Sequence, residues 1–125
     1  MRVLIVDDNN EYRRCLREIL AEQKDLSLDG EAPDGEAGVL LAQQLRPDII
    51  FMDIHMPGMS GLEATRRVKE HLAGTTVIIL SADETYRDSV AECGADAFLS
   101  KYSSISEILA VIRRVRPRKA DEERP

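Results

Sequence analysis

The sequence predicts an α/β domain in which helices cover both faces of a parallel, doubly wound sheet of five strands. Short apolar runs alternate with helical patterns five times along 125 residues, and this order produces parallel sheets through right-handed crossovers. Three of the runs, Val3–Val6, Ile49–Met52 and Thr76–Leu80, are apolar throughout, as in strands buried on both faces. The length fits one domain.

Composition narrows the possible functions. Seventeen basic and 23 acidic residues give a net charge of −6, which disfavours nucleic-acid binding by this domain. No apolar run approaches the roughly 18 residues that span a bilayer, and Asp7 follows the first apolar residues too early for a signal peptide. Cys15 and Cys93 belong to no metal or redox motif and are expected to be core residues in a reducing cytoplasm. We therefore expect a cytoplasmic domain without membrane contact.

The first half of the chain contains two helices that flank a short strand. Asn9 and Asn10 offer oxygens to cap a helix that continues to about Gln23. Alternating residues predict a strand at Leu26–Ala32. The next helix has apolar residues on one side and must end before Pro47.

The second half repeats this pattern after the central strand. The predicted elements are a helix from Ser60 to Leu72, a helix after Ser81-Ala82-Asp83 that continues through Cys93, a strand at Ala97–Leu99 and a final helix over Ile105–Val115. Gly94 suits the left-handed residue that follows a helix. We assign residues 1–116 to one domain, and 117–125 to a charged tail or the start of a linker.

Polar side chains follow four of the predicted strands. They are Asp7 and Asp8, then Asp53, Ser81 and Lys101. The carboxyl ends of parallel strands share one edge of the sheet, so these residues are expected to converge there. Neighbouring carboxylates repel by about 1 kcal/mol per pair in water and about 4 kcal/mol at an effective dielectric of 20. Such a cluster needs a counter-charge, which Lys101 and Mg²⁺ (or Mn²⁺) would provide.

This arrangement suggests phosphoryl transfer to a carboxylate. Asp53 would act as the nucleophile and form an acyl phosphate. Asp8 and Asp53 would hold Mg²⁺, with Asp7 in its outer shell. Ser81 and Lys101 would contact the bound phosphoryl group.

The motifs resemble those of a known family. V-D-D ends the first strand, D-x-x-M-P-G-M-S-G follows the third, S-A follows the fourth and F-L-S-K lies at the fifth. Together they resemble the receiver domains of two-component response regulators, the CheY-like family, over about Val3 to Val115. The resemblance implies a flavodoxin-like (βα)₅ fold with strand order 2-1-3-4-5. It also implies a sensor histidine kinase as phosphodonor, and a homodimer on phosphorylation through a face formed by helix 4, strand 5 and helix 5.

The resemblance also implies a role for each matched residue. Asp53 is the phosphoacceptor, Asp7 and Asp8 are the acidic pair, and Lys101 is the lysine of the pattern. Ser81 is the switch hydroxyl, and Phe98 is the aromatic that changes rotamer. His55 offers its main-chain carbonyl to the metal, and the side chains of His55 and Asp83 tune the phosphate lifetime. The simpler interpretations remain open. Ser81 alone could cap a helix, Phe98 could be plain core, and Asp83 could stabilise a helix dipole.

One position departs from the common pattern. Many receivers follow the lysine with proline, whereas this chain has Tyr102, for which a trans peptide is expected. Receivers of the NarL/FixJ (LuxR-type) regulators often lack that proline, and often carry the sequence of Met56–Ala64. Their output domains bind DNA, which implies transcriptional control through a domain absent here. A stand-alone receiver that relays by protein contact is the alternative.

Three other functional classes are compatible with part of the pattern. A phosphatase with an aspartate nucleophile would need a second Asp where His55 stands. A flavin-binding module would need a loop rich in Ser, Thr and Gly where Asp7 and Asp8 stand, because acids repel phosphate. A degenerate receiver would not need the complete set of site residues.

Overall fold

The computed structural model describes residues 1–115 and confirms the α/β fold. All strand pairs are parallel, and the strand order is β2-β1-β3-β4-β5, as the resemblance implied. The elements are β1 (Arg2–Val6), α1 (Asn10–Ala21), β2 (Ser27–Ala32), α2 (Gly35–Leu45), β3 (Ile49–Met52), α3 (Gly61–His71), β4 (Thr76–Ser81), η1 (Glu84–Tyr86), η2 (Val90–Cys93), β5 (Ala97–Ser100) and α4 (Ile105–Arg114).

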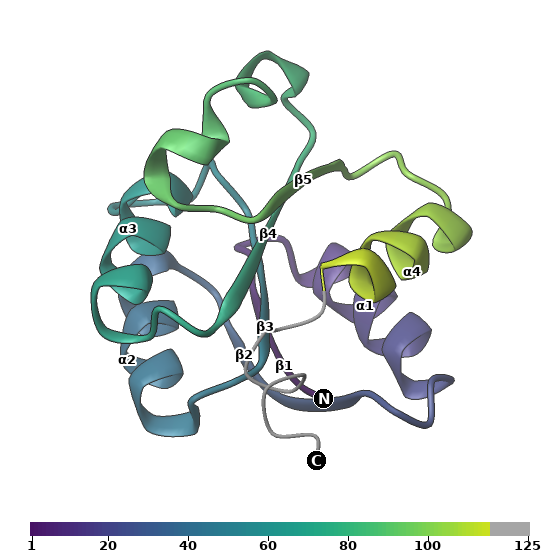
Figure 1. Ribbon diagram of the computed structural model, residues 1–125. Coiled ribbons are helices and arrows are strands. Elements are labelled where there is room, and N and C mark those ends of the chain that lie inside the picture. Colours follow the sequence, from purple (N-terminus) through teal and green to yellow (C-terminus); the bar gives the residue numbers. More distant parts are fainter. Residues whose placement is uncertain (116–125) are drawn as a thin grey trace.

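The sheet separates two apolar cores. Helices α2 and α3 lie on one side of it, and α1 and α4 lie on the other (Figure 1). Alternate residues of a strand point to opposite faces, so Leu4 and Val6 join the α2/α3 core while Val3 and Ile5 join the α1/α4 core. All four of these β1 side chains are fully buried. Burial on both faces explains why the strands are apolar throughout.

The helix caps follow the predictions closely. The side chain of Asn9 accepts a hydrogen bond from the Tyr12 N–H at 3.0 Å, and that of Ser60 accepts one from the Glu63 N–H at 3.2 Å. Helix α1 ends at Ala21, before the expected Gln23. The boundary shift is of the size expected for frayed helix ends.

The prediction of a helix between Asp83 and Cys93 is wrong. The segment forms two 3₁₀ turns, η1 and η2, with hydrogen bonds between residues three apart. Only Val90 and Cys93 are buried within them, so packing supports only one turn. The Asp83 carboxylate accepts a hydrogen bond from the Thr85 N–H at 3.0 Å, and such local side-chain contacts compete with helix formation. Gly94 has the expected left-handed conformation, with φ of 92°.

A close contact sets the start of α3 against the end of β3. A Cβ atom on Gly61 would lie 1.7 Å from the carbonyl oxygen of Asp53. The Gly61 N–H also donates to the Ile54 carbonyl at 2.8 Å. Only glycine allows this approach. The loop after Asp53 therefore returns directly to the edge of the sheet.

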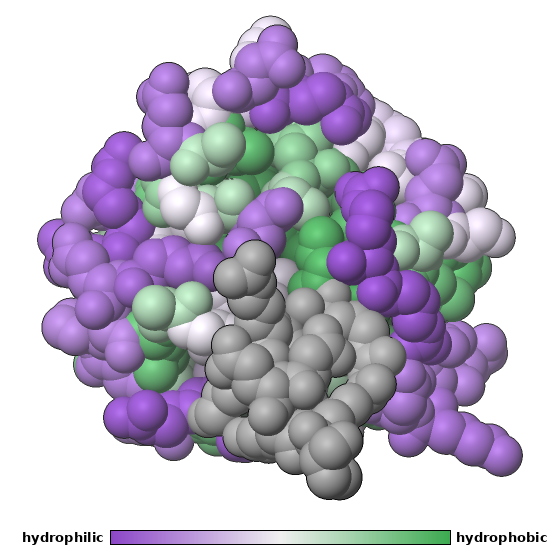
Figure 2. Space-filling view, in the orientation of Figure 1, coloured by the Kyte–Doolittle hydropathy of each residue, from purple (hydrophilic) through white to green (hydrophobic). Residues whose placement is uncertain are grey.

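Hydrophilic residues dominate the periphery of the face in Figure 2, while apolar residues gather nearer its middle. Within residues 1–115, every helix is too short or too polar to cross a bilayer. The predicted tail at 117–125 lies outside the described residues.

Candidate functional site

The strand register brings the predicted site residues to one edge of the sheet. Val6 of β1 pairs with Met52 of β3, so Asp7 and Asp53 leave adjacent strands side by side. The Asp53 N–H donates to the Val6 carbonyl at 2.9 Å. In this strand order the direction of winding reverses between β1 and β3, and open α/β sheets bind ligands at such a point. The sequence thereby places two acids at the usual binding edge.

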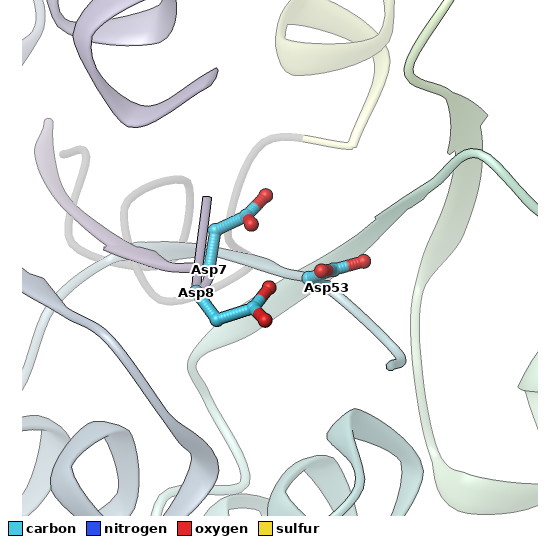
Figure 3. A group of neighbouring side chains, drawn as sticks. All are labelled: Asp7, Asp8 and Asp53. Carbon is cyan, nitrogen blue, oxygen red and sulfur yellow. The ribbon is translucent and has the colours of Figure 1, made fainter. Parts of the chain in front are cut away.

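Three carboxylates form the acidic part of the site. Asp7, Asp8 and Asp53 each offer an oxygen within 4.8 Å of the other two, and Figure 3 shows all three side chains extending into the same space. Asp7 and Asp53 are buried, with 2% and 6% exposure, whereas Asp8 is exposed. One side of the cluster is therefore open to solvent, as a site for a hydrated cation requires.

Lys101 supplies the positive charge of the site. Its Nζ lies 2.7 Å from Asp7 Oδ2 and 3.3 Å from Asp53 Oδ2. The Lys101 N–H donates to the Ser81 carbonyl at 3.0 Å, which aligns the end of β5 with that of β4. A single ammonium thus contacts two buried carboxylates. It offsets only part of their negative charge, so the cluster keeps a net negative charge.

Burial, more than the surrounding charge, sets the pKa of the Asp53 carboxyl. Burial, and secondarily the negative charge of Asp7, raise the pKa of the Asp53 carboxyl to about 6, although Lys101 acts in the opposite direction. One carboxylate oxygen, Oδ1, accepts a hydrogen bond from the Ile54 N–H at 2.9 Å. The other, Oδ2, lies on the side of Lys101. The two oxygens of Asp53 therefore have different surroundings.

Ser81 lines a shallow pocket beside Asp53. The pocket has a volume of about 420 Å³, and its lining is Asp53, His55, Ser81, Ala82, Asp83, Glu84 and Lys101. Ser81 is 1% exposed, and its Oγ accepts a hydrogen bond from the Asp83 N–H at 3.0 Å. The hydroxyl therefore shapes the loop after β4 while it faces the pocket. Its helix-cap interpretation does not apply, because the next element after β4 is the 3₁₀ turn η1, which Asp83 caps.

His55 and Asp83 meet at the mouth of this pocket. The His55 Nε2 lies 3.2 Å from Asp83 Oδ2, and its ring contacts Tyr86 edge to face at 5.2 Å between centroids. Hydrogen bonds from Thr85 and from His55 hold the pKa of the Asp83 carboxyl below its usual value. The helix-dipole interpretation of Asp83 is replaced by a cap on η1. The main-chain carbonyl of His55 as a metal ligand stays a prediction.

Phe98 is buried in the α2/α3 core, at 8% exposure. The guanidinium of Arg87 lies 4.7 Å from the centre of its ring. The resting position of Phe98 is therefore that of a core residue, and its proposed rotamer change is not tested by this arrangement. Among residues 1–115 every peptide bond is trans, including the one before Tyr102.

Sequence reasoning missed one aromatic contact to the site. The Tyr12 ring lies 4.7 Å from Lys101 Nζ. Burial and the charge of Asp7 raise the pKa of the Tyr12 phenol above its usual value, so the phenol is neutral. Tyr12 lies in the first turn of α1, just after Asp7 and Asp8, and that proximity was the available signal.

The sheet and its site define an open α/β domain with an acidic, lysine-balanced centre at the carboxyl ends of its strands. The chain belongs to the response regulator receiver domain family, whose sequence pattern matches residues 3–113. It is therefore a receiver domain of the kind found in two-component response regulators.

Individual proteins are similar to the chain over most of its length. The transcriptional regulatory protein LiaR of Bacillus subtilis is 41% identical over 117 residues, which are 90% of this chain and 54% of LiaR. The chain thus spans about half the length of the curated relatives it matches. A LuxR-family response regulator from Aurantimonas has a TM-score of 0.86 and 26% identity, covering 91% of this chain and 83% of that one.

A third similar protein was solved with ligands. The response regulator TrrA of Thermotoga maritima, in complex with Mg²⁺ and BeF, has a TM-score of 0.83 and 29% identity, covering 90% of this chain and 96% of that one.

Proposed function

We propose that this domain accepts a phosphoryl group on Asp53 from the phosphohistidine of a sensor histidine kinase. The observation that carries the proposal is the position of Asp53 Oδ2, a buried carboxylate oxygen that lies 3.3 Å from Lys101 Nζ beside an open pocket. A carboxylate whose pKa is about 6 is largely ionised at neutral pH, as a nucleophile must be. The family relationship supports the same function.

The donor atoms fit a hard divalent cation. All are carboxylate oxygens, two of them buried and one exposed, which matches the preference of Mg²⁺ (or Mn²⁺) for oxygen ligands and retained waters. Asp8 and Asp53 would bind the ion directly and Asp7 through water, with the His55 carbonyl as a main-chain ligand. When bound, the ion supplies positive charge that offsets the repulsion between phosphate and the three acids.

The residues of the chain then perform the transfer. An Asp53 oxygen forms the new bond to phosphorus while the bond from phosphorus to the donor's imidazole nitrogen breaks, and the departing nitrogen keeps that electron pair. Lys101 contacts the phosphoryl oxygens, where its fixed charge stabilises the transition state. The Ser81 hydroxyl donates a hydrogen bond to the same group. Each step uses a side chain that already lies at the pocket.

The signal leaves through a surface near β5. A Ser81 drawn toward phosphate and a Phe98 that changes rotamer would alter the face formed by η1, η2, β5 and α4, which a second copy or another partner would recognise. LiaR is a transcriptional regulator by name, and the matched 117 residues are only 54% of its length, so we propose transcriptional control through an output domain. The negative charge argues against direct nucleic-acid binding here. A cytoplasmic site of action follows from the kinase partner.

His55 and Asp83 would set how long the phosphate survives. Their contact at 3.2 Å crosses the mouth of the pocket, where a water must enter to attack the acyl phosphate. Substitution of either residue by alanine should open that route and shorten the lifetime. A lifetime unchanged in both variants would contradict this role.

Intact-mass spectrometry after incubation with acetyl phosphate and Mg²⁺ tests the proposal. We expect one phosphoryl group on the wild type, none on Asp53→Asn and none when the metal is chelated. Asp88→Asn is the matched control, because Asp88 is an exposed aspartate outside the pocket, and it should be phosphorylated like the wild type.

A missing adduct would be resolved with beryllofluoride. Stable, Mg²⁺-dependent binding to the wild type but not to Asp53→Asn would show a competent site with a short-lived phosphate. Absence of both the adduct and the binding would refute the proposed function and favour a degenerate receiver.

A further inference from the structure

Three side chains contact the ammonium of Lys101, and only two of them are acidic. Asp7 and Asp53 contact its Nζ at 2.7 Å and 3.3 Å. On a further side, the ring of Tyr12 lies 4.7 Å from Nζ. An ammonium at this distance is attracted to the electron-rich ring. The Lys101 side chain is only 14% exposed, so this attraction acts with limited screening by water.

Tyr12 is fixed well enough to act as a support. Its N–H donates to the Asn9 side chain in the cap of α1, and its ring packs against the α1/α4 core. Tyr12 and Lys101 also line the same groove of about 310 Å³ between α1 and α4. Tyr12 lines this groove but not the phosphorylation pocket, whereas Lys101 lines both.

We infer that Tyr12 is a positioning residue: its ring holds the Lys101 ammonium at the pocket, ready to contact a phosphoryl group on Asp53. This inference rests on the proposed function. Carboxylates alone would hold Nζ in the resting state, but Asp53 must release it when it becomes esterified. The ring contact persists through that change, because it involves neither acid. Tyr12 therefore keeps the lysine beside the transferring group when one of its ion pairs is lost.

The three acids do not depend on this contact. Asp8 is exposed, and Asp7 Oδ1 accepts a hydrogen bond from the Asn9 N–H at 2.9 Å. Loss of the ring should therefore weaken phosphoryl binding without weakening Mg²⁺ binding. That separation distinguishes positioning of Lys101 from general damage to the site.

The test uses Tyr12→Leu and Tyr12→Phe, with Tyr102→Leu as matched control. Tyr102 is adjacent to Lys101 in sequence but is 83% exposed. For Tyr12→Leu we expect beryllofluoride affinity and the rate of phosphorylation by acetyl phosphate to fall about fivefold, as for loss of a cation–π contact. Tyr12→Phe and Tyr102→Leu should stay within about twofold of the wild type, and Mg²⁺ affinity should be unchanged throughout.

A second readout does not need phosphorylation. The chain has four lysines, so ¹³C-labelled lysine gives few NMR signals, and Lys101→Gln identifies that of Lys101. Its ε-protons should be shifted upfield by the ring in the wild type and in Tyr12→Phe, and should lose that shift in Tyr12→Leu. If Tyr12→Leu does not fold, Tyr12→Met replaces it.

The outcomes separate the two proposals. Wild-type kinetics in Tyr12→Leu, or equal losses in Tyr12→Leu and Tyr12→Phe, would overturn the role of the ring while leaving Asp53 as the acceptor. Loss of Mg²⁺ affinity in parallel would also overturn it, as damage to the acids. A wild type that neither reacts nor binds beryllofluoride would refute the proposed function. The upfield shift of the Lys101 ε-protons would then still show whether Tyr12 holds Lys101. If the wild type lacked this shift, the positioning role of Tyr12 would be overturned as well.

Discussion

Replacement of Asp53 by asparagine should stabilise the metal-free domain at neutral pH. The folded-state pKa of Asp53, about 6, lies about two pH units above its ordinary value of 3.8, which corresponds to about 3 kcal/mol of destabilisation when the carboxyl is ionised. Asparagine has the same shape, carries no charge, and can still accept from the Ile54 N–H. We expect Asp53→Asn to raise the free energy of unfolding at pH 7 by about 2–3 kcal/mol.

The contribution of Asp53 to the free energy of unfolding depends on pH in one direction. Between pH 3.8 and about 6 the folded state binds more protons at Asp53 than the unfolded state, so the stability contributed by this group falls as pH rises through that window. The advantage of Asp53→Asn over the wild type should therefore be near zero at pH 4 and complete by pH 7. The difference between the two proteins isolates Asp53 from the other titrating groups.

Urea unfolding in the presence of a chelator, at pH values from 4 to 7, measures this difference. Asp88→Asn is the control, because it removes an exposed carboxylate that lies outside the pocket. A stability difference that does not change with pH, or an Asp53→Asn variant that is less stable than the wild type at pH 7, would refute the electrostatic account of the site.

Three other perturbations test the site and its supports. Mg²⁺ should raise the melting temperature of the wild type more than that of Asp53→Asn, because the ion offsets a repulsion that the variant lacks. Gly61→Ala should cost about 3 kcal/mol in urea unfolding, because its Cβ would lie 1.7 Å from the Asp53 carbonyl oxygen. Thr65→Val should stabilise by about 1 kcal/mol, because the buried Thr65 hydroxyl has no hydrogen-bond partner among residues 1–115.

Each of these has a clear contrary result. Equal Mg²⁺-induced shifts in both proteins would show that the ion acts elsewhere. Gly74→Ala is the control for Gly61, since a Cβ on Gly74 meets open space, and equal costs would contradict the close-contact argument. A destabilised Thr65→Val would mean that the hydroxyl has a partner after all.

The sheet and the convergence of the site were predictable from the sequence. Strands buried on both faces must be apolar throughout, so the abrupt change from Met52 to Asp53 marks both the end of a strand and the edge where ligands bind. Parallel strands then bring Asp7, Asp53 and Lys101 together whatever the details of the loops. The strand order itself came from the family resemblance.

Two features depended on contacts that no local pattern reveals. The segment between Asp83 and Cys93 looked helical, but it has too few buried positions for packing to overcome the local hydrogen bonds of Asp83 and Ser89. The contact of Tyr12 with Lys101 joins α1 to the loop after β5, and only the three-dimensional arrangement brings these together.

The hydrogen bond from the Ile54 N–H to Asp53 has a consequence for the geometry of the product. A free carboxylate rotates, and its two oxygens are interchangeable. Here Oδ1 is tied to the backbone and Oδ2 is turned to the lysine, so the symmetry of the group is broken before any phosphate arrives. The rotational entropy of this side chain is lost on folding instead of at the moment of reaction. An acyl phosphate formed on the lysine side would have its direction set by the main chain.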